Sequence, residues 1–248
     1  MRFLRIAKFD FENILRNPTL LFSNTVMPLI LIGLMGFVTQ SFFGSGNMSS
    51  YDYYGVSMIT LSALLIIMTA TNAFMEERVK RANIRMIYAP IPKAEIYLSK
   101  ILSTYILGTL SFSIILMIGQ YLFHINYGGG NLPYILLLVN MLVLFGSCFG
   151  TMMCCVMGDE EKASSISQLP VLFFSAFGGI FFSVYGLGKT VAAISNLSPV
   201  KWILECAFRI IYDNDFALLL PVTFSLFGAS IACVIVCQLT FKPEDFTC

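Results

Sequence analysis

The chain has 248 residues, of which 57% are hydrophobic and only 12% are charged, and its formal net charge is +1. A soluble domain carries about 25% charged residues, so this composition excludes a water-soluble globular protein. The near-neutral charge gives no overall bias toward nucleic acid. We therefore expect an all-α polytopic membrane protein with a single transmembrane domain over residues 1–248, in contact with membrane lipid and without a nucleic-acid partner.

Residues 1–17 are expected to form an amphipathic helix that lies in the membrane interface. Apolar residues recur at intervals of three and four from Phe3 to Ile14, while basic residues such as Arg5 take the other side. This pattern is typical of a helix that places its apolar face in lipid and its cations near the head groups. Pro18 then predicts a turn into the bilayer.

Six apolar runs are long enough to cross a bilayer, whose hydrocarbon core of about 30 Å requires about 20 apolar residues in a helix. These six expected transmembrane helices are residues 19–42, 54–74, 96–123, 132–157, 165–185 and 216–241. In the fifth run, Pro170 and the pair Gly178–Gly179 predict a bent or two-part helix.

The distribution of Lys and Arg predicts the orientation, because cytoplasmic loops carry an excess of both. With the N-terminus inside, twelve of the 15 basic residues fall in inside segments. Only Lys189, Lys201 and Arg209 fall outside. Both termini are therefore predicted to be cytoplasmic.

Residues 186–215 are expected to form a re-entrant outer helical segment before the sixth span. Pro199 begins a helical pattern of apolar residues, and charged residues at a spacing of four, from Lys201 to Asp213, form one face. A charged face is costly in hydrocarbon, so we expect this segment to lie on the outer half of the membrane or to dip into it.

Residues 75–95 hold the densest group of charges in the chain and are expected to form a cytoplasmic loop. Apolar residues such as Ile84 and Ile87 lie among these charges, a mixture that suits insertion into a groove on a soluble partner. A second acidic stretch, residues 158–165, is interpreted equally as a solvated turn or as a second contact with that partner.

Phenylalanines crowd the fifth run, at positions 173, 174, 177, 181 and 182. Aromatic residues at helical spacing are usually packing or lipid-facing residues, and the alternative is the wall of a cavity for an apolar substrate. No span centre carries Asp, Glu, Lys or Arg. This counts against an ion-coupled carrier and leaves no evident general base for an intramembrane enzyme.

No metal site and no catalytic residue are predicted. The seven cysteines lack CxxC spacing and a nearby His set, so we interpret them as small packing residues. The sequence GLGKT at residues 186–190 resembles the end of a phosphate-binding loop, but Ser183 stands where that pattern requires Gly. If ATP is used, another polypeptide must bind it.

Four short motifs, in this order along the chain, resemble those of a known family. They are Glu77-Arg78, residues 85–90 (RMIYAP), residues 96–100 (IYLSK) and Leu197-Ser198-Pro199. Together with the layout of all 248 residues, they resemble the permeases of the ABC-2 family, the membrane half of an ATP-binding-cassette exporter. Ser99 stands where many members have Gly, a departure for which we expect little consequence.

The resemblance implies that two six-span subunits, identical or homologous, pair above two ATPase subunits. The loop after the second span would then form a coupling helix at about residues 80–88. The residues expected to contact the ATPase are Glu77, Arg78, Lys80, Arg81, Ile84, Arg85, Ile87 and Tyr88. The substrate path would run near the second and fifth spans, with Asn72, Phe173, Phe174, Phe177 and Phe181 as candidate residues. ATP and magnesium would bind the ATPase, with no cofactor on this chain.

We therefore expect a permease subunit, not an enzyme, that exports an amphipathic drug, peptide or lipid across the cell membrane of a bacterium. The lack of intramembrane charge favours such a substrate. The alternative is a stand-alone ion-coupled carrier or an intramembrane enzyme. A neighbouring reading frame that encodes GxxxxGK[ST] would favour the permease.

Overall fold

The computed structural model describes residues 2–41, 43, 48–75, 92–181 and 193–241. Every regular element among these residues is helical. The elements are α1 (Arg2–Leu15), α2 (Pro18–Leu21), η1 (Phe22–Val26), α3 (Met27–Val38), α4 (Ser50–Met75), α6 (Lys93–Leu122), η2 (Gly129–Asn131), α7 (Leu132–Met157), α8 (Glu160–Phe177), α10 (Pro199–Phe208), η4 (Arg209–Asp213) and α11 (Leu219–Thr240).

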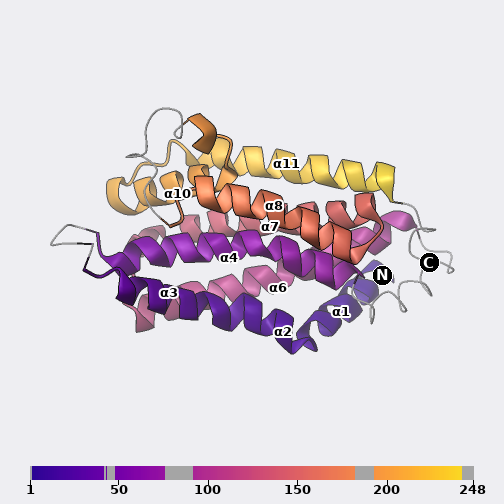
Figure 1. The fold of residues 1–248 in the computed structure, drawn as a ribbon, viewed down its shortest axis with the longest axis horizontal. Helices are drawn as coiled ribbons and strands as arrows, with labels where there is room; N and C mark the ends of the chain where they lie inside the picture. Colours follow the sequence, from indigo (N-terminus) through magenta and orange to yellow (C-terminus); the bar gives the residue numbers. More distant parts are fainter. Residues whose placement is uncertain (1, 42, 44–47, 76–91, 182–192, 242–248) are drawn as a thin grey trace.

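The long helices lie side by side along one axis, with α4 through the middle of the bundle (Figure 1). One end of the bundle, here termed the α1 end, carries α1, the end of α4 and the start of α6. The opposite end, here termed the α10 end, carries α10 and the connection from α3 to α4 (Figure 1). In the predicted orientation the α1 end faces the cytoplasm.

Five helices among the described residues are long and apolar enough to cross a membrane. They are Pro18–Val38, Ser50–Phe74, Ala94–Leu122, Gly129–Met157 and Leu219–Thr240. They correspond to the first, second, third, fourth and sixth apolar runs. The second and third helices begin before their expected runs, and an acidic residue in each first turn, Asp52 or Glu95, favours the earlier start.

The fifth apolar run behaves differently from its prediction. It corresponds to α8, which begins earlier, at Glu160, and ends at Phe177, so it is not among the five. The helix continues through Pro170 and ends where Gly178 and Gly179 follow, the latter at φ 81°. Residues 182–185 of the expected run lie outside the described residues.

Local side-chain chemistry explains where several helices begin and end. Asn17 separates α1 from α2, because its side-chain oxygen accepts hydrogen bonds from the backbone nitrogens of Thr19 at 3.1 Å and Leu20 at 3.4 Å. The chain therefore changes from one helix to the next just before Pro18, where the turn was expected. Asp159 starts α8 in the same way by accepting from the nitrogen of Lys162 at 3.0 Å. The acidic stretch 158–165 is thus mostly the first turns of a helix.

A stripe of small residues on α7 allows that helix to lie close against α4. A Cβ atom added at Gly150 would lie 2.4 Å from the carbonyl oxygen of Ile67, and one at Gly146 would lie 2.4 Å from the side chain of Ile66. One turn further on, the thiol of Cys154 contacts the carbonyl oxygen of Thr71 at 3.7 Å. Small residues at a spacing of four are a common way to bring helices together in lipid, where packing replaces the hydrophobic effect.

Candidate functional site

The residues predicted to contact an ATPase lie outside the described part of the chain. All eight, from Glu77 to Tyr88, fall within residues 76–91. The structure does describe the two helices that this segment connects, because α4 ends at Met75 and α6 begins at Lys93. Both ends lie at the α1 end of the bundle (Figure 1).

A buried ion pair joins α1 to α6 at that same end. The ammonium of Lys100 contacts the carboxylate of Asp10 directly, and the two side chains are 2% and 1% exposed. The hydroxyl of Ser99 donates to the other carboxylate oxygen of Asp10 at 2.7 Å. One turn along α6, the hydroxyl of Ser103 donates to the carbonyl oxygen of Ala7 at 2.9 Å. These contacts dock the face of α1 that carries Asp10 against α6.

No sequence pattern predicted this pair. Lys100 is one of the twelve basic residues assigned to inside segments, and Ser99, for which little consequence was expected, donates a hydrogen bond to Asp10. A signal was present, because Asp10 lies three residues after Ala7 and four before Ile14. That spacing places an acidic residue on the buried face of an amphipathic helix. What the sequence did not indicate is the partner, 90 residues away along the chain.

The rest of the α1 surface is both apolar and charged. Leu4 and Phe9 are 61% and 50% exposed, and Arg5, Lys8 and Glu12 are exposed as well. One side of α1 is therefore held by α6, while the other presents apolar and charged side chains together.

Three phenylalanines of the expected substrate path lie together on α8, and the fourth, Phe181, follows that helix. Phe173 lies between two others, with ring centroids 5.9 Å from Phe174 and 4.9 Å from Phe177. Phe173 and Phe181 are exposed, whereas Phe174 and Phe177 are half-buried. The structure thus presents an aromatic surface on the half of α8 nearer the α10 end.

Asn72 does not lie near these phenylalanines. Helices α4 and α8 are antiparallel, because Met68 contacts Ser164 at 3.8 Å while the hydroxyl of Tyr53 donates to the carbonyl oxygen of Gly179 at 2.6 Å. By this register Asn72 is about 20 Å along α4 from the level of the aromatic surface, at about 1.5 Å per residue. The two parts of the expected path therefore belong to opposite halves of the bundle.

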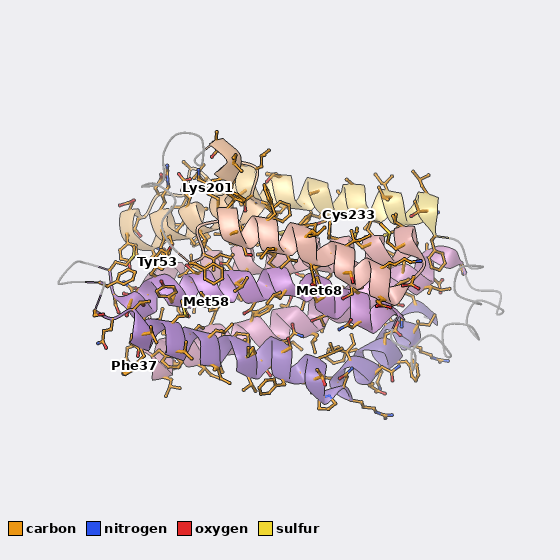
Figure 2. The ribbon with its side chains drawn as sticks, in the orientation of Figure 1. Phe37, Tyr53, Met58, Met68, Lys201 and Cys233 are labelled. Atoms are coloured by element: carbon orange, nitrogen blue, oxygen red, sulfur yellow. The ribbon has the colours of Figure 1, made fainter. Side chains whose placement is uncertain are left out.

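Side chains from several helices hold α10 at its end of the bundle. The hydroxyl of Ser198, just before α10, donates to the carbonyl oxygen of Phe174 at 2.9 Å. The ring of Tyr53 on α4 stacks on Phe208 at a centroid distance of 5.5 Å (Tyr53 is labelled in Figure 2). In addition, Asn131 donates to the carbonyl oxygen of Ile210 at 3.1 Å. The expected ladder of charges is present in part, because Arg209 pairs with Glu205 at 2.7 Å.

Asp52, near the start of α4, gathers polar groups at the α10 end. Its carboxylate accepts hydrogen bonds from the backbone nitrogens of Asn126 at 2.7 Å and Ser49 at 3.1 Å. Burial, with the charge of Asp52, raises the pKa of Tyr212 to about 12, and the same two causes raise the pKa of Tyr127. The hydrogen bonds of Asp52 thus join the start of α4 to the loop that follows α6.

The described helices together define a multi-pass helical membrane protein. The family model described as ABC-2 type transporter matches residues 1–212. The chain therefore belongs to the ABC-2 type transporter family.

One relative is the linearmycin resistance permease protein LnrN of Bacillus subtilis (strain 168). It is 26% identical over 154 residues, which cover 62% of this chain and 40% of the relative. The match thus spans less than half the length of that protein.

Proposed function

We propose that this chain is the membrane-spanning subunit of an ABC exporter in the cell membrane of a bacterium. It would move an amphipathic drug, peptide or lipid, while a separate ATPase subunit binds magnesium and hydrolyses ATP. Two permease chains, identical or homologous, would pair. Family membership supports this function, and the name of the relative, which refers to resistance to linearmycin, favours a drug among the three substrate classes.

The proposed topology has six spans and two cytoplasmic termini. Helix α8 with the residues after it would be the fifth span, residues 186–215 the re-entrant segment, and α1 an interfacial helix. The exposed Leu4 and Phe9 beside Lys8 and Arg16 support the interfacial position. The excess of Lys and Arg in the predicted cytoplasmic segments supports the orientation.

The observation that carries the proposal is the docking of α1 on α6 at the end of the bundle where α4 ends and α6 begins. The segment 76–91 connects α4 to α6, so a soluble partner that displaced it would act on both helices. Helix α6 would carry α1 with it, because removing either partner from the buried Asp10–Lys100 pair is strongly unfavourable. Helix α4 would pass the motion to α7, since the small residues of α7 hold these two helices in close contact.

The experiment is a purification in mild detergent through a tag on the C-terminus, with identification of the proteins that accompany the chain. We expect a soluble ATPase in about equal amount. It should be lost when residues 80–88 are replaced by a Gly/Ser linker, and retained in Arg209→Gln, which removes an exposed cation at the opposite end. A chain that purifies alone, also with ATP analogues present, would refute the assignment and direct attention to an intrinsic activity.

A further inference from the structure

A polar side chain lies on the outer surface of α8, about halfway along the bundle. Gln168 is exposed, and no hydrogen bond joins its amide to the described part of the chain. Helix α8 runs beside α4 (Figure 1), and their antiparallel register places Gln168 level with about Leu64. Leu64 lies near the middle of the span Ser50–Phe74. Gln168 is therefore about 15 Å from the nearer end of that span, at about 1.5 Å per residue.

An amide at this depth is unfavourable against hydrocarbon, because lipid tails offer no hydrogen-bond partner. The side chain of glutamine has only two methylene groups, so it is too short to extend from the middle of the bundle to the head groups. The exposed residues halfway along two other outer helices are apolar. They are Leu110 and Ile114 on α6, and Ile231 and Ile235 on α11. Those surfaces suit lipid, whereas the surface of α8 requires a polar partner.

The residues around Gln168 suit close packing against another helix. Leu169 and Leu172 are 66% and 67% exposed, and the short side chains of Ser165 and Ala176 are exposed as well. At about 100° per residue, these four residues and Gln168 occupy an arc of about 100° on α8. We term this arc the Gln168 face. In membranes, small residues let helices approach closely, and amide side chains form hydrogen bonds between helices.

We propose that the Gln168 face packs against the same face of a second copy of this chain, with the two Gln168 amides hydrogen-bonded across a two-fold axis. An amide is self-complementary, because its nitrogen donates and its oxygen accepts. A two-fold contact joins the same surface of both subunits, so one residue supplies both halves of the bond. This contact rests on the proposed function for the pairing of two permease chains, and it names the surface through which they pair.

The experiment measures dimer formation in a membrane. The purified chain, labelled with one fluorophore on a C-terminal tag, is reconstituted into phosphatidylcholine vesicles at increasing ratios of lipid to protein. Single-molecule photobleaching then gives the fraction of dimers and the dissociation constant. We expect two bleaching steps for the unaltered chain at low dilution. Gln168→Leu should raise the dissociation constant about threefold to tenfold, as expected for one hydrogen bond between membrane helices. Gln168→Asn keeps the amide and should retain more of the dimer.

Two matched controls separate this surface from general effects of polarity and size. Gln120 is an exposed amide near the end of α6, so Gln120→Leu makes the same chemical change and should leave the dissociation constant unchanged. Leu172→Trp adds bulk to the Gln168 face and should raise the dissociation constant. Leu110→Trp adds the same bulk to the exposed surface of α6 and should not.

An unaltered chain that bleaches in single steps at every dilution would overturn the proposal. A dissociation constant unchanged in Gln168→Leu would overturn it as well, and would direct attention to a water-filled path or another membrane protein as the partner of this amide. Capture of an ATPase is measured separately on the same variants. A dimer weakened by Gln168→Leu without ATPase capture would refute the proposed function and leave the contact in place. ATPase capture with a dimer unaffected by Gln168→Leu would do the reverse.

Discussion

The buried ion pair between α1 and α6 makes the sharpest prediction about stability. Asp10→Ala would leave the ammonium of Lys100, 2% exposed, without its counter-ion in the protein interior. Breaking a buried pair by removing one partner costs about 3–5 kcal/mol, because the remaining charge stays desolvated. At about 2–4 °C per kcal/mol for a chain of this size, the midpoint of thermal unfolding should fall by about 6–20 °C.

The assay is thermal unfolding of the purified protein in detergent, followed by loss of the monodisperse peak in size-exclusion chromatography. Limited trypsin digestion adds a local measurement, since α1 should be cleaved faster once it leaves α6. Glu12→Ala is the matched control in the same helix. Glu12 pairs with Lys8 at 3.8 Å, and the two side chains are 47% and 77% exposed. Such an exposed pair contributes at most about 1 kcal/mol to stability.

A double variant decides whether charge is the cause. Replacing both partners by apolar residues, Asp10→Leu with Lys100→Met, removes the two buried charges together, so it should be far more stable than the sum of the single changes implies. The reasoning would be refuted if Asp10→Ala unfolded within about 2 °C of the unaltered protein. It would also be refuted if the double variant lost as much as both single variants combined.

Three further predictions concern the packing of α4 and the proposed coupling. Gly150→Ala places a methyl group against a backbone carbonyl of α4 and should lower the free energy of unfolding by about 1–3 kcal/mol. Gly228→Ala has open space around it and should raise the unfolding midpoint. The reverse order of the two midpoints would contradict the close packing of α4 and α7. Tyr53→Phe removes the 2.6 Å hydrogen bond to the carbonyl that follows α8 and should cost about 1–3 kcal/mol, which an unchanged midpoint would disprove. Arg81→Glu with Arg85→Glu should leave the protein inserted and ATP hydrolysed while transport is lost; unchanged transport in vesicles would argue against a coupling role.

The parts of the fold that depend on local pattern could be predicted from the sequence. Apolar runs of sufficient length predict helices because each backbone polar group in lipid must be satisfied within its own helix. The start of the first span at Pro18 and the amphipathic character of α1 follow from residues a few positions apart. The fifth run was less predictable, since α8 begins with charged and hydroxyl residues that dilute its apolar character.

The candidate sites depend on contacts between residues far apart in the sequence. The phenylalanines of α8 lie together because they share one helix face. Their spacing in the sequence was therefore sufficient to predict that they are neighbours. Whether they lie near Asn72 depends on how α4 and α8 align. The antiparallel register places Asn72 and the phenylalanines at different depths of the bundle. Likewise, Gly146 and Gly150 show a small-residue spacing, but nothing in the sequence indicated that α4 is the helix they contact.

The amino-acid sequence alone determined that this chain lies in a membrane, where five of its spanning helices run, and which family its motifs resemble. Composition and periodicity are sufficient for those conclusions, because the bilayer imposes one length and one polarity on every span. Only the tertiary structure decided that Asp10 pairs with Lys100 and that Trp202 meets α11 around a cavity. Such pairings arise from packing among helices, which depends on the shapes of surfaces that are distant in sequence and adjacent only after folding.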